Sequence, residues 1–267
     1  MQIPSKRVEI IKVNHQQVSQ TDDVLSIEEP LEIRLLQDKN LTPVSVTMRT
    51  PGHDAELAVG FFYTEGILKG IEEVKEVHHP TENTVVIELA KTVSVDPSVF
   101  ARNFYTTSSC GVCGKASIDA IRVRHDVVLS NCIVSYNVIK GLAEVGRSSQ
   151  SIFKETGGCH ASSIFSVDGN LLLTREDVGR HNALDKVIGH CLLNKIDMTN
   201  CILLVSGRAS FELLQKAAVA GIPILVAIGA PSSLAVELAQ EAGITLVGFL
   251  KEQEFNIYSH PDRIRTV

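Results

Sequence analysis

Apolar and polar residues alternate over several stretches of the first hundred residues. Alternation with a period of two is typical of strands that bury one face, and it occurs at residues 7–13, 31–35, 44–48 and 85–89. Between the last two stretches, apolar side chains recur at helical spacing over residues 54–68, after Pro51-Gly52. The pattern predicts a small β-rich α+β domain at the start of the chain.

The hydrophobic pattern changes in the second half of the chain, where continuous apolar runs replace the alternation. Runs at residues 202–205 and 224–228 are each followed by a turn and an amphipathic stretch, and a third run covers residues 244–249. Buried strands that alternate with amphipathic helices indicate a largely parallel α/β sheet. We therefore expect two domains, residues 1–105 and residues 106–267, although no linker composition marks their boundary.

The composition is that of an ordinary globular protein, with 44% hydrophobic and 21% charged residues among 267. The formal net charge is −6, so a nucleic-acid surface is not expected without a local basic patch. The longest apolar stretch, around residues 222–230, is far shorter than the ~20 residues that a membrane-spanning helix needs. The first residues lack the apolar region of a secretory signal, and we expect a cytoplasmic protein that binds no membrane.

The cysteines give the first indication of chemistry. Without a secretory signal, and with enough chain for a hydrophobic core, a disulfide framework is not expected. Cys132, Cys191 and Cys201 lie in apolar surroundings, which predicts that they pack as small buried hydrophobes. Cys159, which His160 follows, either packs in the same way or contributes to a site.

Cys110 and Cys113 form a CxxC motif in which a glycine follows each cysteine. Residues 115–121 are predicted to be helical, so that a helix N-terminus and Lys115 would stabilise a thiolate, the reactive form of cysteine. Three interpretations remain open, namely a structural zinc site, a thioredoxin-like redox pair and a persulfide carrier, and spacing alone favours the first two. No second CxxC pair completes a zinc site, so we expect no bound metal.

Residues 176–186 place many polar side chains at the start of a predicted helix. Such a charged run predicts a solvated face, with Asp177 as a helix cap and Asp185 paired with Lys186 or Arg180. The alternative is that Arg180 and its neighbour His181 donate to a phosphate.

Two loops, residues 206–210 and 229–233, follow predicted strands and precede predicted helices. Ligands of open α/β sheets bind at such carboxyl ends of strands, and helix N-termini favour phosphates. Arg208 is the cation best placed in these loops, and its planar guanidinium suits a phosphate. The alternative is ordinary turn chemistry, with Ser232 or Ser233 as a helix N-cap.

Several specific motifs run through nearly the entire chain: Met48-Arg49-Thr50-Pro51-Gly52, Ser109-Cys110-Gly111-Val112-Cys113-Gly114, Gly158-Cys159-His160-Ala161, Glu176-Asp177-Val178-Gly179-Arg180-His181 and Ser206-Gly207-Arg208-Ala209-Ser210. In these motifs the chain resembles the formate dehydrogenase accessory sulfurtransferase family (FdhD/NarQ type). The resemblance implies a cytidine-deaminase-like three-layer α/β domain, preceded by the smaller β-rich α+β domain.

The resemblance also implies a function. A member of this family is a sulfur carrier that accepts sulfane sulfur from a cysteine desulfurase and delivers it to the molybdenum or tungsten bis(molybdopterin guanine dinucleotide) cofactor of formate dehydrogenase. Cys110 corresponds to the persulfide-bearing cysteine and Cys113 to its partner, and a homodimer is expected. A thiol–disulfide oxidoreductase and a noncatalytic cofactor-binding chaperone remain the alternatives.

The cofactor-binding segment of the family corresponds here to Phe249, Leu250, Lys251, Glu252, Gln253 and Glu254. Family members commonly carry a glycine and a second basic residue in this turn, whereas Lys251 is its only cation here. We therefore expect backbone contacts to the dinucleotide in this turn, and a larger contribution from Arg208 than from Lys251.

Overall fold

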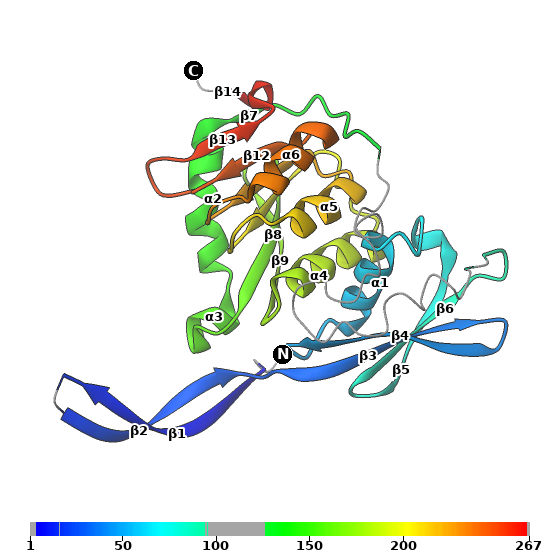
Figure 1. The fold of residues 1–267 in the computed structure, drawn as a ribbon, viewed down its shortest axis with the longest axis horizontal. Coiled ribbons are helices and arrows are strands. Elements are labelled where there is room, and N and C mark those ends of the chain that lie inside the picture. The colour runs from blue at the N-terminus through cyan, green and yellow to red at the C-terminus, as the bar shows by residue number, and fades with distance from the viewer. Residues whose placement is uncertain (1–3, 16, 94, 96–125, 266–267) are drawn as a thin grey trace.

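A computed structural model describes residues 4–15, 17–93, 95 and 126–265. The CxxC motif, the helix predicted at residues 115–121 and the predicted domain boundary lie outside the described residues. Within the described part of the chain the strands form four sheets, of which a four-stranded and a six-stranded sheet organise the fold (Figure 1).

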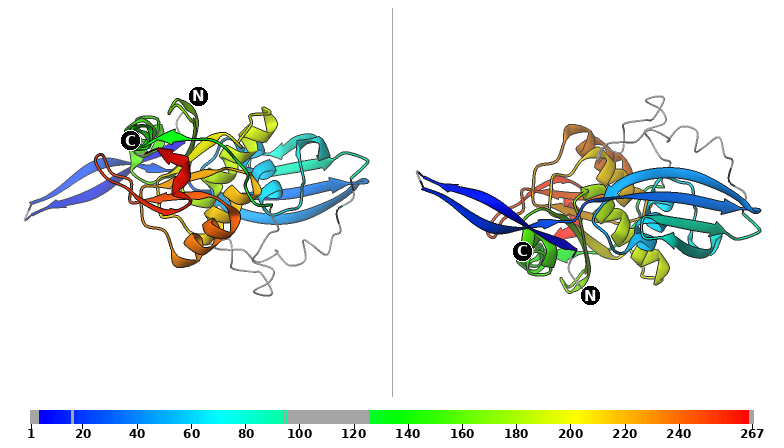
Figure 2. Two further views of the ribbon diagram at one scale, coloured as in Figure 1. Left: turned by 90° about the horizontal axis from the view of Figure 1, so that it is seen from above. Right: turned by 90° about the horizontal axis from the view of Figure 1, so that it is seen from below.

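An antiparallel ribbon of two long strands, β1 (Ser5–Asn14) and β2 (Gln17–Ser26), extends away from the rest of the molecule. The alternating pattern predicted β1, whereas β2 is mostly polar and gave no strand signal. The base of the ribbon contacts α3 (Ser151–Thr156), where the hydroxyl oxygens of Ser26 and Thr156 lie 2.6 Å apart. Figure 2 shows the ribbon and the four-stranded sheet on opposite sides of the molecule.

The four-stranded sheet has the order β4-β3-β6-β5, with β3 and β6 parallel and the other pairs antiparallel. The helix α1 (Asp54–Thr64) buries Leu57 and Phe62 against one face of the sheet. The strands are β3 (Glu29–Gln37), β4 (Asn40–Arg49), β5 (Val74–Thr81) and β6 (Thr84–Leu89). A 3-10 turn, Ile71–Glu73, precedes β5.

The six-stranded sheet has the order β13-β12-β11-β10-β8-β9, and its three central strands β10, β11 and β12 are parallel. The apolar runs of the sequence form these central strands, as predicted. The remaining strands pair antiparallel at the two edges. The strands are β8 (His160–Ser166), β9 (Leu171–Asp177), β10 (Cys201–Val205), β11 (Ile224–Ala227), β12 (Thr245–Gly248) and β13 (Asn256–Ser259).

Helices cover both faces of the six-stranded sheet (Figure 1). One face carries α2 (Tyr136–Ser148), and the other carries α4 (Arg180–Leu193), α5 (Phe211–Val219) and α6 (Ser233–Ala242). Two short strands, β7 (Val134–Ser135) and β14 (Ile264–Arg265), pair in parallel, and the 3-10 turn Pro261–Arg263 precedes β14. The predicted α/β fold class is confirmed. No helix of the described residues is long and apolar enough to cross a membrane.

The helices α1 and α4 approach each other closely at two glycines. A Cβ atom at Gly60 would overlap the carbonyl oxygen of Asp185, and one at Gly189 would overlap that of Glu56. Only a residue without a side chain allows backbones to approach in this way. The two glycines therefore fix how closely the β-rich part of the chain packs on the α/β part.

Two buried ion pairs lie beside this crossing. Lys186 Nζ lies 2.7 Å from Asp177 Oδ2 and donates to the carbonyl oxygen of Thr50 (2.8 Å). Lys216 Nζ lies 2.9 Å from the carboxylate of Asp185. All four charged side chains are buried.

The expectation of a solvated face over residues 176–186 is therefore wrong. The helix α4 lies between the β-rich part and the six-stranded sheet, so burial reaches its charged residues on both sides. Asp177 is more than a helix cap. Its carboxylate forms an ion pair with Lys186 and also accepts a hydrogen bond from the backbone N–H of Gly179 (2.8 Å). Asp185 pairs across the fold with Lys216 rather than locally.

We predict opposite effects of two glycine-to-alanine substitutions on the free energy of unfolding. Gly189→Ala should lower it by about 1–3 kcal/mol, because the new methyl group forces α1 and α4 apart. Gly141→Ala in α2 is the matched control: no atom lies within 4 Å of its added Cβ, so alanine should raise stability by about 0.5–1 kcal/mol. Urea unfolding measures both, and equal midpoints for the two variants would contradict the close-packing argument.

Candidate functional site

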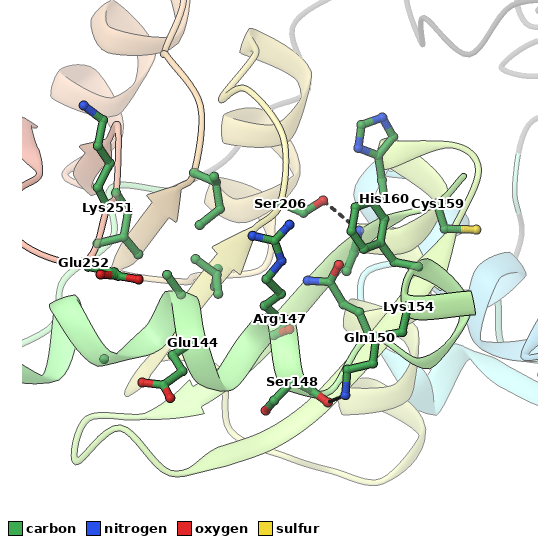
Figure 3. A pocket seen from close by; sticks show the side chains of 18 of the residues that line it. Glu144, Arg147, Ser148, Gln150, Lys154, Cys159, His160, Ser206, Lys251 and Glu252 are labelled. Atoms are coloured by element: carbon green, nitrogen blue, oxygen red, sulfur yellow. Dashed lines mark hydrogen bonds between the residues drawn. The ribbon is translucent and has the colours of Figure 1, made fainter. Parts of the chain in front are cut away.

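A cleft of about 1430 Å³ opens beyond the carboxyl ends of the three parallel strands (Figure 3). Ser206 follows β10, Ile228 follows β11 and Leu250 follows β12, and all three line the cleft. Ligands of open α/β sheets bind at this place because the loops that follow the strands diverge there. The helices α2 and α3 form the opposite wall.

The wall formed by α2 results from an amphipathic helix with a defined start. Ser135 caps it by accepting from the backbone N–H of Asn137 (3.3 Å), and Ile139 is fully buried beneath it. Its outer side presents Lys140 and Arg147 to the cleft. These residues are seven positions apart, two helical turns, and therefore share one face.

The short helix α3 is held by a carboxylate. Glu176 accepts hydrogen bonds from the backbone N–H groups of Ile152 (2.9 Å) and Phe153 (2.8 Å). These donors have no partner inside the helix, and the buried carboxylate of β9 supplies one. Glu176 thereby places Lys154, which lines the cleft and donates to the carbonyl oxygen of Ser148.

Cys159 lines one end of the cleft, but its thiol points away from the centre (Figure 3). Its Sγ donates to Ser26 Oγ (3.3 Å) and lies 3.6 Å from Thr50 Oγ1. Burial is the main cause that raises the pKa of this thiol. Because the thiolate is the nucleophile, the environment of Cys159 indicates a packing role.

His160 lies beside Cys159 at the same end of the cleft. Burial, and then the positive charge of Arg180, lower the pKa of its ring. Both causes favour the uncharged form of the imidazole. Ser206 closes this end, because its hydroxyl accepts from the backbone N–H of Ala161 (2.9 Å).

The structure brings part of the predicted cofactor segment to the cleft. Leu250, Lys251, Glu252 and Gln253 line it. Lys251 and Glu252 lie at the end opposite to Cys159 and His160 (Figure 3). Phe249 and Glu254 are not among the lining residues. Glu254 instead pairs with Lys251, with 2.6 Å between Oε1 and Nζ.

Arg208, the cation that the sequence favoured, is exposed and does not line the cleft. Lys140, Arg147 and Lys154 supply positive charge inside it, and none of the three was predicted from the sequence. The spacing of Lys140 and Arg147 on one helix face was visible in the sequence. What the sequence did not show is that this face lies opposite the carboxyl ends of the strands.

The other candidates are placed outside the cleft. Arg180 and His181 begin α4 and are not among the lining residues, and His181 Nε2 lies 3.9 Å from Glu212 Oε2 on α5. Ser232 caps α6 by accepting from the backbone N–H of Ala235 (3.3 Å), so ordinary turn chemistry explains that loop. Cys110 and Cys113 lie outside the described residues.

The described residues contain one group of side chains with the arrangement of metal ligands. Glu76, His78 and Glu88 lie together on the solvent side of the four-stranded sheet, away from the cleft. Lys75 Nζ lies 2.6 Å from Glu88 Oε1 and already neutralises that carboxylate. This group is part of the exposed sheet surface and has no connection with Cys159 or His160.

Comparison with known proteins gives a consistent result. The model of the FdhD/NarQ family matches residues 26–265. The sulfur carrier protein FdhD of Mycolicibacterium paratuberculosis is 46% identical over 99% of this chain and 100% of the relative. The proteins of the same name from Streptomyces coelicolor (45% identical, 97% of this chain, 95% of the relative) and Sulfurisphaera tokodaii (44%, 97% and 98%) are similar to it over almost their whole lengths.

A solved structure supports the fold. A crystal structure described as that of a formate dehydrogenase accessory protein from Desulfotalea psychrophila superposes with a TM-score of 0.77 and covers 98% of this chain and 99% of that one. The two sequences are 23% identical. At this level of identity the likeness establishes the shared fold.

We predict that the four described cysteines resist alkylation in the folded protein. All four are buried, and burial raises the pKa of Cys191 to about 12 and that of Cys201 to about 11. At pH 8 the thiols of Cys191 and Cys201 are therefore almost entirely protonated. Burial also shields all four cysteines from the reagent, so iodoacetamide should label them only after unfolding. Peptide mapping by mass spectrometry, with guanidinium-unfolded protein as the control, reads each cysteine separately. Labelling of Cys191 at the same rate in folded and unfolded protein would contradict this.

Proposed function

The chain belongs to the FdhD/NarQ family, and on that premise we propose that it is a sulfur carrier for formate dehydrogenase. In this proposal Cys110 accepts a sulfur atom from a cysteine desulfurase and passes it to the bis(molybdopterin guanine dinucleotide) cofactor of molybdenum or tungsten. The cofactor is then inserted into the enzyme. The protein is thus a sulfurtransferase whose client is a large anionic cofactor.

The cleft is the observation that carries the proposal. Its volume of about 1430 Å³ exceeds the roughly 300–1,000 Å³ of pockets for drug-sized ligands. It therefore suits a large ligand, and its position beyond the carboxyl ends of the strands is the usual one for nucleotides in α/β folds. These properties support a dinucleotide cofactor as the occupant.

Local charge in the cleft supports an anionic occupant. The whole chain has a net charge of −6 and does not attract anions by its overall field. Arg147 and Lys154 nevertheless line the middle and one end of the cleft. The guanidinium of Arg147 lies 6.0 Å from the ring centre of Phe153, which orients its planar fork.

The sulfur chemistry follows from thiol–persulfide exchange. The Cys110 thiolate attacks the outer sulfur of the desulfurase persulfide; a new S–S bond forms, the old one breaks, and the desulfurase cysteine leaves as a thiolate. Cys113 then attacks the inner sulfur of the Cys110 persulfide, which forms a Cys110–Cys113 disulfide and releases the outer sulfur as hydrosulfide toward the cofactor. A thiol reductant supplies two electrons to restore both cysteines.

The same chemistry excludes Cys159 as the carrier within this proposal. Its thiol is buried, its pKa is raised, and its sulfur is engaged by Ser26 and Thr50. Attack on a persulfide needs an accessible thiolate. The carrier is therefore expected among the cysteines of the CxxC motif.

We predict that Cys110→Ala abolishes sulfur loading. After incubation with a cysteine desulfurase and cysteine, intact-protein mass spectrometry should show one added sulfur on the wild type and none on this variant. Cys159→Ala is the control and should still load, because its buried thiol takes no part. Maturation of formate dehydrogenase should fail with Cys110→Ala. Full maturation with that variant would favour the noncatalytic chaperone, and insulin reduction by the wild type would favour the oxidoreductase.

We predict that GDP, which represents half of the dinucleotide, binds with Arg147 as its main cation. Arg147→Ala should weaken GDP binding by about 1–3 kcal/mol, the contribution of a hydrogen bond to a charged group. Arg208→Ala is the matched control. Arg208 is exposed outside the cleft, so this substitution should weaken GDP binding less than Arg147→Ala does. Titration calorimetry compares the two variants. Weaker GDP binding by Arg208→Ala, with unchanged GDP affinity in Arg147→Ala, would show that the loop of residues 206–210 binds the nucleotide instead.

A further inference from the structure

We infer that Arg180 binds the sulfur anion that the carrier releases, at a site beside the cleft. This inference rests on the proposed function and adds to it the residue that stabilises the departing sulfur. It concerns the last residues of the motif at positions 176–181, for which the packing around Asp177 gives no role.

Three segments meet beside the end of the cleft at His160. In the six-stranded sheet His160 pairs with Asp177 of β9, so that the start of α4, which follows Asp177 closely, lies next to it. The loop after β10 lies on the other side of β8, where a Cβ atom at Gly207 would be 3.5 Å from Nδ1 of His160. Arg180 is the first residue of α4, and its charge acts on His160. Arg180 therefore lies beside the cleft without lining it.

The guanidinium of Arg180 has no partner in the described part of the chain. It forms neither a hydrogen bond nor an ion pair there, although its Nε atom is buried. The hydroxyl of Ser210, which precedes α5, is a second buried polar atom without a hydrogen-bond partner among these residues. Arginine stays charged in proteins, and buried polar groups are almost always hydrogen-bonded. Two such groups at one junction point to a bound anion.

The other charged groups of the junction do not neutralise this guanidinium. Glu212, at the start of α5, pairs with His181, with 3.9 Å between Oε2 and Nε2. Asp177 pairs with Lys186. The second arginine of the junction, Arg208, is exposed. The unpaired, partly buried guanidinium is therefore the group that remains available to an anion.

The site suits an anion with a single charge. Burial raises the pKa of Glu212, but opposing effects, among them the charges of His181 and Arg180, lower it on balance, so that the carboxylate is ionised at neutral pH. A nearby carboxylate repels a phosphate dianion more strongly than a monoanion. Hydrosulfide carries one charge on one sulfur atom, and it is the anion that the proposed transfer releases.

In the proposed transfer, negative charge moves onto the sulfur that leaves. The Cys113 thiolate attacks the inner sulfur of the Cys110 persulfide, and the S–S bond of the persulfide breaks. The outer sulfur keeps its proton and departs with the bonding electrons as hydrosulfide. A fixed cation beside the departing sulfur stabilises this charge as it develops, and the N–H groups of Arg180 donate to it. The anion is then held beside His160, which lines the cleft proposed for the cofactor.

Nuclear magnetic resonance of the full chain tests binding of the anion directly. The Nε–H resonance of Arg180, identified by its loss in Arg180→Lys, should shift saturably as sodium hydrosulfide is added to the reduced, isotope-labelled protein. Inorganic phosphate should shift it less. Arg208→Lys is the matched control, because it changes an exposed arginine of the neighbouring loop and should leave the shift of the Arg180 resonance unchanged.

The rate of sulfur release tests the role of the bound anion. After loading by a cysteine desulfurase, the wild type and Arg180→Gln should each carry one added sulfur in intact-protein mass spectrometry. Release of hydrosulfide, trapped with monobromobimane, should then be about tenfold or more slower in Arg180→Gln, because a hydrogen bond to a charged group is lost. Arg180→Lys should be intermediate, and Arg208→Gln should release at the wild-type rate.

Stability and phosphate binding separate the alternatives. Since Arg180 has no partner among the described residues, Arg180→Gln should unfold at the wild-type urea midpoint, and a marked fall would assign Arg180 a structural role instead. A resonance that phosphate shifts and hydrosulfide does not would make this a phosphate site. Equal release rates in the wild type and Arg180→Gln would overturn this inference alone. Failure of the wild type to load sulfur would overturn the proposed function, and the resonance titration would still decide whether Arg180 binds the anion.

Discussion

The buried pair of Asp177 and Lys186 is the interaction on which the rest of the structure depends. Both charges are removed from water and satisfied by Thr50, whose backbone N–H donates to Asp177 (3.1 Å) and whose carbonyl oxygen accepts from Lys186 (2.8 Å). An unpaired charge at such a place costs about 3–5 kcal/mol, so the three groups must come together. They join the residue after β4 to the end of β9 and the middle of α4, and thus the β-rich part of the chain to the α/β part.

The geometry of the cleft follows from this junction. Glu176 precedes the pair and holds α3, while the Thr50 hydroxyl accepts from the backbone N–H of Val178 (3.1 Å) and lies against Cys159. Residues 176–178 therefore hold both the end of the cleft at Cys159 and the contact between the β-rich part and the α/β part of the chain. This structural role explains Glu176 and Asp177 of the motif.

The sequence predicted those features that depend on local pattern. Continuous apolar runs gave β10, β11 and β12, because a strand buried on both faces has no polar side. It did not predict β2, whose polar residues form a strand only by pairing with β1, or the burial of Lys186, which depends on two layers closing around α4. Arg147 was missed for the same reason, because its importance depends on where α2 lies, not on the residues beside it.

The turn after β12 shows how charge is distributed along the cleft. Glu254 neutralises Lys251, so this turn supplies no net attraction for a phosphate. Positive charge is supplied instead by Lys140 and Arg147 on α2 and by Lys154 on α3, the helix that Glu176 holds in place. In the proposed function these cations hold the phosphates of the cofactor. The end of the cleft at His160 offers no second reactive thiolate, because the Cys159 thiol is buried and its pKa is raised.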